Sequence, residues 1–302
     1  MTDYGHDLLF GTFITPTTQP VMHAVDLAVV ADRAGLDLVT FQDHPYQPAF
    51  HDTWTLLAYV ASRTEQIHVS GNVLNLPLRQ PAVLARSAAS LDLLSGGRFE
   101  LGIGAGAFWD AIEAMGGRRL TPAQGVVALE EAIRIVREIW AVGTRERVQV
   151  AGRHYQVDGA KRGPAPAHDI GIWVGAYRPK MLNLTGRVAD GWLPSLGHLP
   201  DGPADLEELN THIDDAAISA GREPSDVRRL LNIAGRFAPS GSSLLNGPPR
   251  LWAEQLAELT LDHGMTGFIL AADDAASIER FAAEVAPATR ELVATGRAAP
   301  TT

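Results

Sequence analysis

The chain has 302 residues, 46% of them hydrophobic, with no cysteine and a formal net charge of −10. The missing cysteines exclude disulfides, thiolate nucleophiles and cysteine-ligated metals, so any redox chemistry requires a bound organic cofactor. The negative charge disfavours nonspecific binding to nucleic acid or anionic lipid, and because no apolar run approaches the ~20 residues that span a bilayer, we expect a cytoplasmic protein.

Apolar strand-like runs alternate with helical patterns along the chain. Strands are predicted at residues 8–14, 38–42, 67–74, 99–104, 170–175, 191–195, 230–237 and 267–272. Helices are predicted at residues 21–34, 53–63, 81–94, 122–142, 180–188, 204–220, 251–263 and 275–293. Asp52 and Thr121 are the expected N-caps of two of these helices, and Gly96 ends a third.

This alternation predicts a (β/α)8 barrel rather than an open sheet, because the spacings are too short for independent domains. Residues 147–157 indicate a hairpin that turns at Gly152, and a loop rich in glycine, proline and alanine follows at 158–168. We therefore expect one domain over residues 1–302, with an insertion around 145–169 beside the barrel mouth.

Distinctive residues follow several predicted strands, at the barrel end where active sites lie. Asp43 and His44 come directly after the second strand, where the imidazole suits acid/base chemistry. A structural pair in which Asp43 caps a loop explains the spacing equally well. His44 and His51 lack the i, i+4 spacing of a helical metal pair, and we expect no metal site.

Backbone groups offer a second kind of binding site. Asn72, Val73 and Leu74 end the third strand, where irregular backbone can contact a heterocycle, although an ordinary strand end is the simpler interpretation. Gly104, Ala105 and Gly106 permit close approach of a ligand but lack the third-glycine spacing of a dinucleotide loop.

A third segment precedes the helix predicted at 180–188, whose first-turn N–H groups can hold a phosphate, with the guanidinium of Arg178 as a further donor. This segment consists of Gly175, Ala176, Tyr177, Arg178 and Pro179.

Taken together, five motifs resemble the bacterial luciferase-like superfamily of flavin-dependent oxidoreductases, particularly its coenzyme F420-dependent branch. They are QDHP at 42–45, SGNVLNLPLRQP at 70–81, SGGRFELGIGAG at 95–106, LEEAIRIVREIW at 129–140 and GRVADGW at 186–192. The resemblance covers nearly the whole chain, and the motifs are specific only jointly.

The resemblance implies a deazaflavin or flavin ring across the barrel mouth, backed by a bulge with a non-proline cis peptide at Asn72-Val73. Asp43 and His44 would contact the ring near its reactive carbon, with His44 as the catalytic proton donor or acceptor. The loops at 104–106 and 175–179 would hold the ribityl chain and phosphate. Hydride transfer at coenzyme F420 is then the expected chemistry.

The chain departs from the sugar-phosphate dehydrogenases of this branch, which carry a glutamate after the fourth-strand glycines where this chain has Ala107. They also carry a tryptophan shortly after the Asp-His pair, where residues 48–50 contain none. We therefore expect a small, apolar substrate in a pocket bounded by Phe13, Phe50, Phe108 and Trp109.

Two alternatives stay open. One is an FMN-dependent monooxygenase supplied by a separate flavin reductase, and the other is a non-catalytic flavin-binding barrel. His44 favours the F420-dependent enzyme over both. Relatives of this kind are commonly dimers, so a homodimer is expected.

Overall fold

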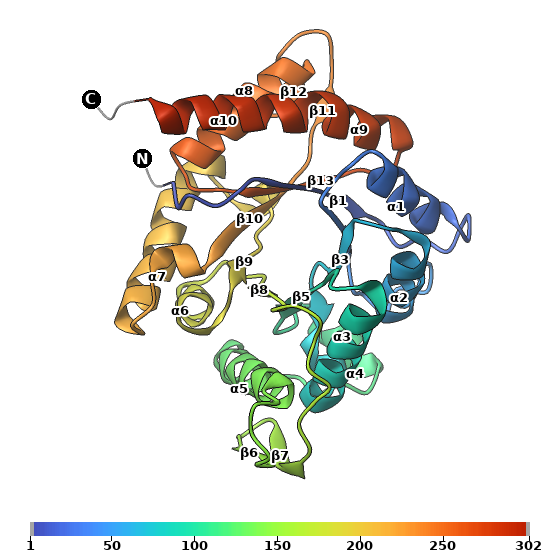
Figure 1. The fold of residues 1–302 in the computed structure, drawn as a ribbon, viewed down its shortest axis with the longest axis vertical. Coiled ribbons are helices and arrows are strands. Elements are labelled where there is room, and N and C mark those ends of the chain that lie inside the picture. Colours follow the sequence, from blue (N-terminus) through green and yellow to red (C-terminus); the bar gives the residue numbers. More distant parts are fainter. Residues whose placement is uncertain (1–2, 300–302) are drawn as a thin grey trace.

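The computed structural model describes residues 3–299. Within this part of the chain, eight parallel strand positions close into a barrel, in the order β1, β2, β3, β5, β8, β9, β10, β13 and back to β1. Figure 1 shows the helices as a ring around these strands. The predicted (β/α)8 barrel is confirmed.

The barrel is built from strands β1 (Leu9–Ile14), β2 (Leu38–Phe41), β3 (His68–Gly71), β4 (Leu74–Asn75), β5 (Phe99–Gly104), β8 (Ile172–Val174), β9 (Gly191–Trp192), β10 (Arg228–Ile233) and β13 (Gly267–Ala271). The α-helices are α1 (His23–Arg33), α2 (Thr53–Arg63), α3 (Pro81–Ser95), α4 (Trp109–Ala114), α5 (Pro122–Trp140), α6 (Pro179–Val188), α7 (Asp205–Ser219), α8 (Pro249–Leu261), α9 (Ala275–Arg280) and α10 (Ala286–Ala298). None of the helices in residues 3–299 combines the length and apolar character that a membrane crossing needs.

Local capping explains where several helices begin and end. The Asp52 carboxylate accepts from the Thr55 N–H at 2.8 Å and so begins α2. Thr121 and Gln124 form a reciprocal capping box at the start of α5. Gly96 takes a left-handed φ of 74° directly after α3, a conformation that glycine adopts without penalty.

Other elements differ from the sequence prediction. The C-terminal helix is not one continuous α-helix, because a π-helical turn (η5, Phe281–Val285) joins α9 to α10. The short helix α4 was not predicted, because six residues carry too little periodicity. The predicted hairpin forms as β6 (Val148–Ala151) and β7 (Gln156–Ala160), an antiparallel sheet separate from the barrel and visible at its side in Figure 1.

The seventh predicted strand was also too long. It ends at Ile233, and a separate pairing of β11 (Arg236–Phe237) with β12 (Asn246–Gly247) follows. The predicted third strand is likewise divided into β3 and β4. Ser70 pairs with Glu100, and Leu74 pairs with Ile103. Between these two pairs the third strand advances four residues while β5 advances three, and the extra residue defines a β-bulge.

Two layers of apolar side chains hold the barrel together. Inside it, Leu38, Trp173, Leu193, Leu230 and Ile269 pack as one cluster with Leu9, Phe13 and Val73 at its edge. A larger cluster joins the outer faces of the strands to the helices. Because Phe13 and Val73 end the inner cluster near the carboxyl ends of their strands, they form the floor of the barrel mouth.

Candidate active site

A large cavity lies at the carboxyl end of the barrel. Its volume is about 1270 Å³, and the ends of β5 and β8 line it together with the first turns of α5, α6 and α7. It brings together predicted residues from two distant segments, namely Ala105, Gly106, Trp109, Gly175, Ala176, Tyr177, Arg178 and Pro179. The first turn of α6, with Arg178 and Lys180, offers donors for an anion at one side of the cavity, whereas Asp205 and Glu208 line the side formed by α7.

The bulge after β3 presents Val73 to these loops. The Asn72-Val73 peptide is cis, as the resemblance implied. A Cβ added to Gly104 would lie 2.6 Å from Val73 Cγ2, and one added to Gly175 would lie 3.4 Å from the same atom. Leu74, which follows, is buried in β4. The Val73 side chain therefore fills the space that the two glycines leave open, and any larger residue at position 104 would displace it.

A pair of amides crosses the barrel mouth. Asn72 Nδ2 donates to Asn232 Oδ1 at 2.7 Å, and Asn232 Nδ2 donates back to Asn72 Oδ1 at 3.1 Å. Thr40 and Ser195 extend this network at 3.2 Å on either side. Asn232 was not predicted from the sequence, although an asparagine near the end of an apolar strand is the kind of signal that marked Asn72.

The Asp43 carboxylate is buried and fully engaged by the protein. Arg79 donates to both of its oxygens from Nε and Nη2 at 2.8 to 3.0 Å, and the Asn75 N–H donates to Oδ2 at 2.8 Å. The carboxylate thus ties the end of β2 to β4. This geometry matches the structural interpretation of Asp43, and contact between Asp43 and a cofactor ring stays a prediction.

His44 lies half-buried beside two aromatic rings. Its ring stacks on Tyr46 with centroids 5.4 Å apart and meets the edge of Phe108 at 5.2 Å. Loss of solvent lowers the pKa of His44 from its ordinary value, and the negative charge of Asp43 opposes this effect. The imidazole is therefore neutral at pH 7 and able to accept a proton, and its catalytic role stays a prediction.

Tyr177 links two loops of the mouth. Its hydroxyl accepts from the Ser195 N–H at 2.8 Å and lies 3.2 Å from His198 Nδ1. His198 also lines the large cavity and was not singled out in the sequence, because it follows no predicted strand directly. Tyr177 therefore holds the loop after β9 against the loop after β8.

The four aromatic residues expected to bound an apolar substrate pocket lie in different surroundings, and their shared pocket stays a prediction. Phe13 belongs to the inner barrel cluster, whereas Phe108 is 57% exposed and packs on His44. Trp109 faces the large cavity. Phe50 lies in the loop before α2, where its backbone pairs with Thr17. Phe108 precedes α4 and Trp109 begins it, so these two neighbours face different surroundings.

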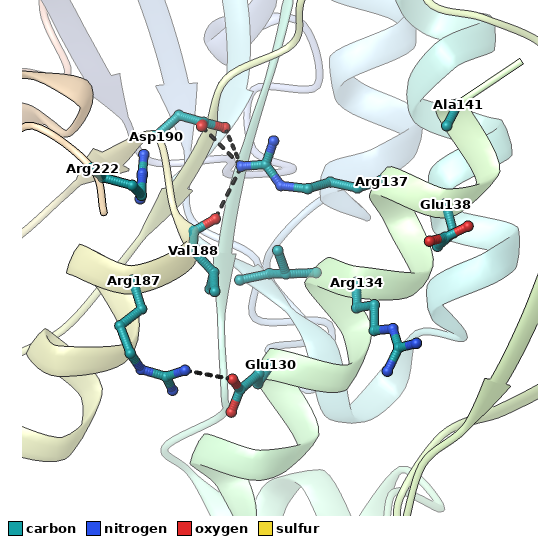
Figure 2. Close-up of a pocket in the computed structure, with 10 residues that line it drawn as sticks. Glu130, Arg134, Arg137, Glu138, Ala141, Arg187, Val188, Asp190 and Arg222 are labelled. Carbon is teal, nitrogen blue, oxygen red and sulfur yellow. Dashed lines mark hydrogen bonds and ion pairs between the residues drawn. The ribbon is translucent and has the colours of Figure 1, made fainter. Parts of the chain in front are cut away.

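A second groove, of about 590 Å³, lies outside the barrel between α5 and α6. Arg137 donates to the Asp190 carboxylate at 2.8 Å, and Arg187 donates to Glu130 at 2.8 Å. Figure 2 shows both pairs as dashed lines. The Arg187–Glu130 pair fastens α6 to α5, and the Arg137–Asp190 pair joins α5 to the segment after α6. The groove contains none of the predicted site residues.

The family model described as luciferase-like monooxygenase matches residues 5–239. The chain belongs to this family. The match includes both halves of the barrel mouth, from the strand ends at Asp43 and Asn72 to Ser195 and Asn232.

Curated members of the luciferase-like family resemble the chain over most of its length. An F420-dependent glucose-6-phosphate dehydrogenase of Microbacterium testaceum is 30% identical over 297 residues, which are 89% of this chain and 85% of the relative. A 5,10-methylenetetrahydromethanopterin reductase of Methanolobus tindarius is 33% identical over 220 residues, which are 73% of this chain and 63% of the relative.

Solved structures agree with the fold. An F420-dependent secondary alcohol dehydrogenase, in complex with an F420-acetone adduct, superposes with a TM-score of 0.82 at 18% identity. The superposition covers 94% of this chain and 99% of that one. The resemblance to the F420-dependent branch, expected from the motifs, is confirmed by these relatives.

Proposed function

We propose that this protein is a coenzyme F420-dependent oxidoreductase that transfers a hydride to or from a small organic substrate. The observation that carries the proposal is the shape of the barrel mouth. The bulge at Val73 lies against the glycines of two loops, and half-buried His44 follows the neighbouring strand. The named activities of the curated relatives support the same cofactor.

The residues at the mouth fit such a cofactor. Gly106 has a φ of 95°, and a Cβ there would lie 2.7 Å from Pro77 Cγ, so only glycine keeps this loop packed against Pro77 at the mouth. The N–H groups in the first turn of α6, together with Arg178 and Lys180, suit the phosphate on the ribityl chain of the cofactor. Val73 would support the ring from behind. The cavity of about 1270 Å³ has room for a cofactor of this size.

His44 provides the proton chemistry. When bound, the deazaflavin supplies a carbon that accepts or releases a hydride. The neutral imidazole of His44 accepts the hydroxyl proton of an alcohol substrate and returns a proton to the carbonyl oxygen in the reverse reaction. Tyr46 and Phe108 flank the imidazole and limit its contact with water. Asp43 holds the strand end that carries His44, through Arg79.

The proposed substrate is a small carbonyl compound or alcohol with an apolar substituent. Its support is the aromatic surface that Tyr46 and Phe108 form around His44. Ala107, at the position where sugar-phosphate dehydrogenases carry glutamate, argues against a sugar phosphate.

We also propose that the protein is a homodimer, for which sedimentation equilibrium should give a particle of two 32.3 kDa chains.

Paired titrations test the cofactor directly. Apo-protein is titrated with coenzyme F420 and separately with FMN, and the fluorescence of each cofactor is followed. We expect saturable binding of coenzyme F420 with at least about tenfold preference over FMN, equivalent to about 1.4 kcal/mol. Preference for FMN would overturn the proposal and move the chemistry to reduced flavin and oxygen. Binding of coenzyme F420 without turnover of any alcohol, carbonyl compound or activated alkene would favour the non-catalytic barrel.

A further inference from the structure

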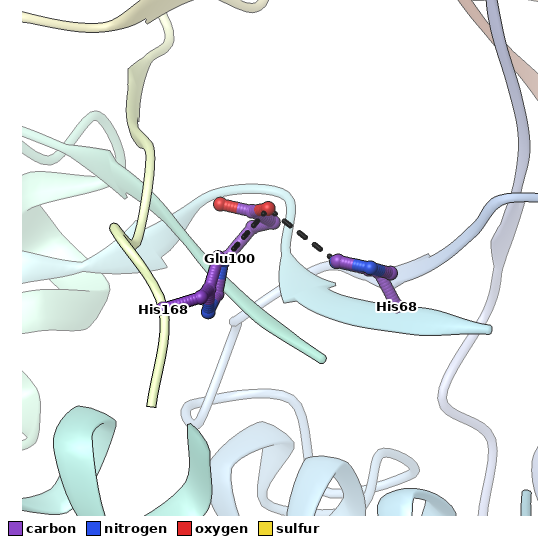
Figure 3. A group of neighbouring side chains, drawn as sticks. All are labelled: His68, Glu100 and His168. Atoms are coloured by element: carbon purple, nitrogen blue, oxygen red, sulfur yellow. Dashed lines mark hydrogen bonds and ion pairs between the residues drawn. The ribbon is translucent and has the colours of Figure 1, made fainter. Parts of the chain in front are cut away.

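Three potential metal ligands converge at the barrel end opposite the active site. His68 begins β3, Glu100 is the second residue of β5, and His168 lies shortly before β8. The Glu100 Oε1 atom lies 3.4 Å from His68 Nδ1 and 3.4 Å from His168 Nε2. Figure 3 shows the Glu100 carboxylate between the two imidazoles. All three donor atoms lie within 4.8 Å of one another.

Neighbouring groups orient two of these ligands. The Nδ1 atom of His168 lies 2.8 Å from Oδ1 of fully buried Asp92, which leaves Nε2 directed at the cluster. The Gly171 N–H donates to Glu100 Oε2 at 2.7 Å, and the other oxygen, Oε1, faces the two histidines. Metal-ligating histidines ordinarily carry such a carboxylate partner on the second ring nitrogen, since it fixes the tautomer and the ring orientation.

The spacing matches tetrahedral coordination after a small adjustment. Zinc binds nitrogen and carboxylate oxygen at about 2.0–2.2 Å, which places neighbouring ligand atoms of a tetrahedron about 3.3–3.6 Å apart. Both distances between Glu100 and the histidines already lie in this range. Only the separation of the two histidine nitrogens needs to shorten, and the His68 side chain, which is 38% exposed, has the freedom to move.

We propose that His68, Glu100 and His168 form a binding site for a divalent transition metal, with Zn²⁺ as the favoured ion. Two imidazoles and one carboxylate form a ligand set suited to zinc. His68 and Glu100 also line a cavity of about 450 Å³ with Asp37 and Arg228, which leaves these two ligands open to solvent on that side. The ion would connect β3, β5 and the segment before β8, and we assign it a structural role.

A metal-free cluster of ion pairs is the alternative. Glu100, by hydrogen bonding and by its charge, raises the pKa of His168 to about 8 despite partial burial. A protonated His168 compensates the carboxylate without any ion. The two accounts differ in one observable, because only a metal site takes up Zn²⁺ stoichiometrically through His68.

The deciding experiment is Zn²⁺ binding to the full-length protein without a histidine tag. After removal of metals by a chelator, Zn²⁺ alone is titrated in competition with a chromophoric chelator. We expect one equivalent per chain, at least about tenfold weaker binding in His68→Gln, and a Zn²⁺-dependent rise in the melting temperature that this variant lacks. The matched control is His263→Gln, which replaces a partly exposed histidine just after α8, outside the cluster, and should bind like the wild type.

His68→Gln is the primary variant because its partial exposure makes misfolding a small risk, and circular dichroism checks its fold. A Glu100→Gln variant adds a test of the carboxylate. Co²⁺ provides a second readout, since tetrahedral Co²⁺ should give intense visible absorption in the wild type only. No saturable binding by the wild type, or binding that survives His68→Gln unchanged, would overturn the proposal in favour of the metal-free cluster.

Discussion

His44 is the residue on which the proposed chemistry depends most. We expect His44→Gln to lower kcat by about 10²–10⁴-fold, the usual contribution of a positioned acid or base. Binding of coenzyme F420 should change by less than about threefold, because hydrogen bonding at the phosphate and backbone loops is retained. Stopped-flow absorbance of the cofactor measures both quantities. Equal loss of binding and turnover would instead make His44 a cofactor ligand without a role in proton transfer.

The pKa of His44 gives a separate prediction. Because desolvation lowers this pKa in the folded protein, the unfolded chain binds a proton at a higher pH than the folded chain does. The stability that neutral His44 provides is therefore present above about pH 6.5 and falls as the pH drops through the folded pKa. NMR titration should place the His44 pKa below about 6.5.

A stability measurement checks the sign of this effect. The wild type should lose more of its free energy of unfolding than His44→Gln does between pH 7.5 and pH 5, measured by urea unfolding. A His44 pKa at or above the unfolded value would contradict the prediction and would make the charge of Asp43 the dominant influence.

The sequence placed His44 directly after the second strand, and the family resemblance carried by the motifs predicted the cis peptide at Asn72-Val73. Neither revealed that Asp43 is held by Arg79, since that pair spans 36 positions and no local pattern connects them. Asn232 was missed for the same reason. It meets Asn72 across 160 positions, and only closure of the barrel brings the two amides together.

At the level of elements, the Asp43 contacts join β2 to β4 behind the active site. Arg79→Met would leave a buried carboxylate with the Asn75 N–H as its remaining partner, and should lower the free energy of unfolding by about 3–5 kcal/mol. Adding Asp43→Asn removes the buried charge, so the double variant should be more stable than Arg79→Met alone. Urea unfolding of the wild type, the two single variants Arg79→Met and Asp43→Asn, and the double variant gives the coupling energy. Additive losses would show that the two side chains do not act as a pair.

The contact between β5 and the bulge gives a second prediction at this level. In Gly104→Ala the new methyl group would collide with Val73 Cγ2 at 2.6 Å and push the bulge toward the cofactor. We expect coenzyme F420 to bind at least about tenfold more weakly, which corresponds to about 1.4 kcal/mol. Val73→Ala in the same chain should restore most of the loss by removing that methyl group.

The matched control for this pair is Gly143→Ala, because a Cβ at Gly143 meets no atom within 4 Å. Unchanged cofactor binding in Gly104→Ala would show that the bulge does not support the ring. Binding that stays weak in the double variant would instead place the effect in the backbone of β5.

Element prediction succeeded where local chemistry is strong. The N-cap at Asp52, the capping box at Thr121 and the left-handed Gly96 each fix a helix end through neighbouring atoms. It failed where tertiary packing decides. The continuous apolar run at 67–74 conceals the bulge, and the periodic run at 275–293 conceals the π-helical turn between α9 and α10.

At the level of the whole molecule, parallel closure places chemistry at both ends of the barrel. The carboxyl ends of the strands carry the proposed cofactor site, which the alternation of strands and helices made predictable. The amino ends carry His68, Glu100 and His168, which no local sequence pattern indicates as a site. Positions 68, 100 and 168 match no spacing motif for metal ligands, and they meet only because β3, β5 and β8 are successive strands of the closed barrel.

Cofactor binding should stabilise the entire barrel, since the mouth is assembled from segments as distant as residues 105 and 212. A ligand that binds only the folded state at 100 times its dissociation constant adds about 2.7 kcal/mol. For a chain of 302 residues this corresponds to a rise of roughly 4 °C in the melting temperature. Coenzyme F420 should produce this shift in the wild type, and FMN at the same concentration should not.

Arg178→Gln, at the phosphate end of the cavity, should reduce the shift in melting temperature. Arg187→Gln in the outer groove should keep it, because Arg187 pairs with Glu130 away from the mouth. An equal shift in both variants would show that the cofactor phosphate does not bind at the first turn of α6.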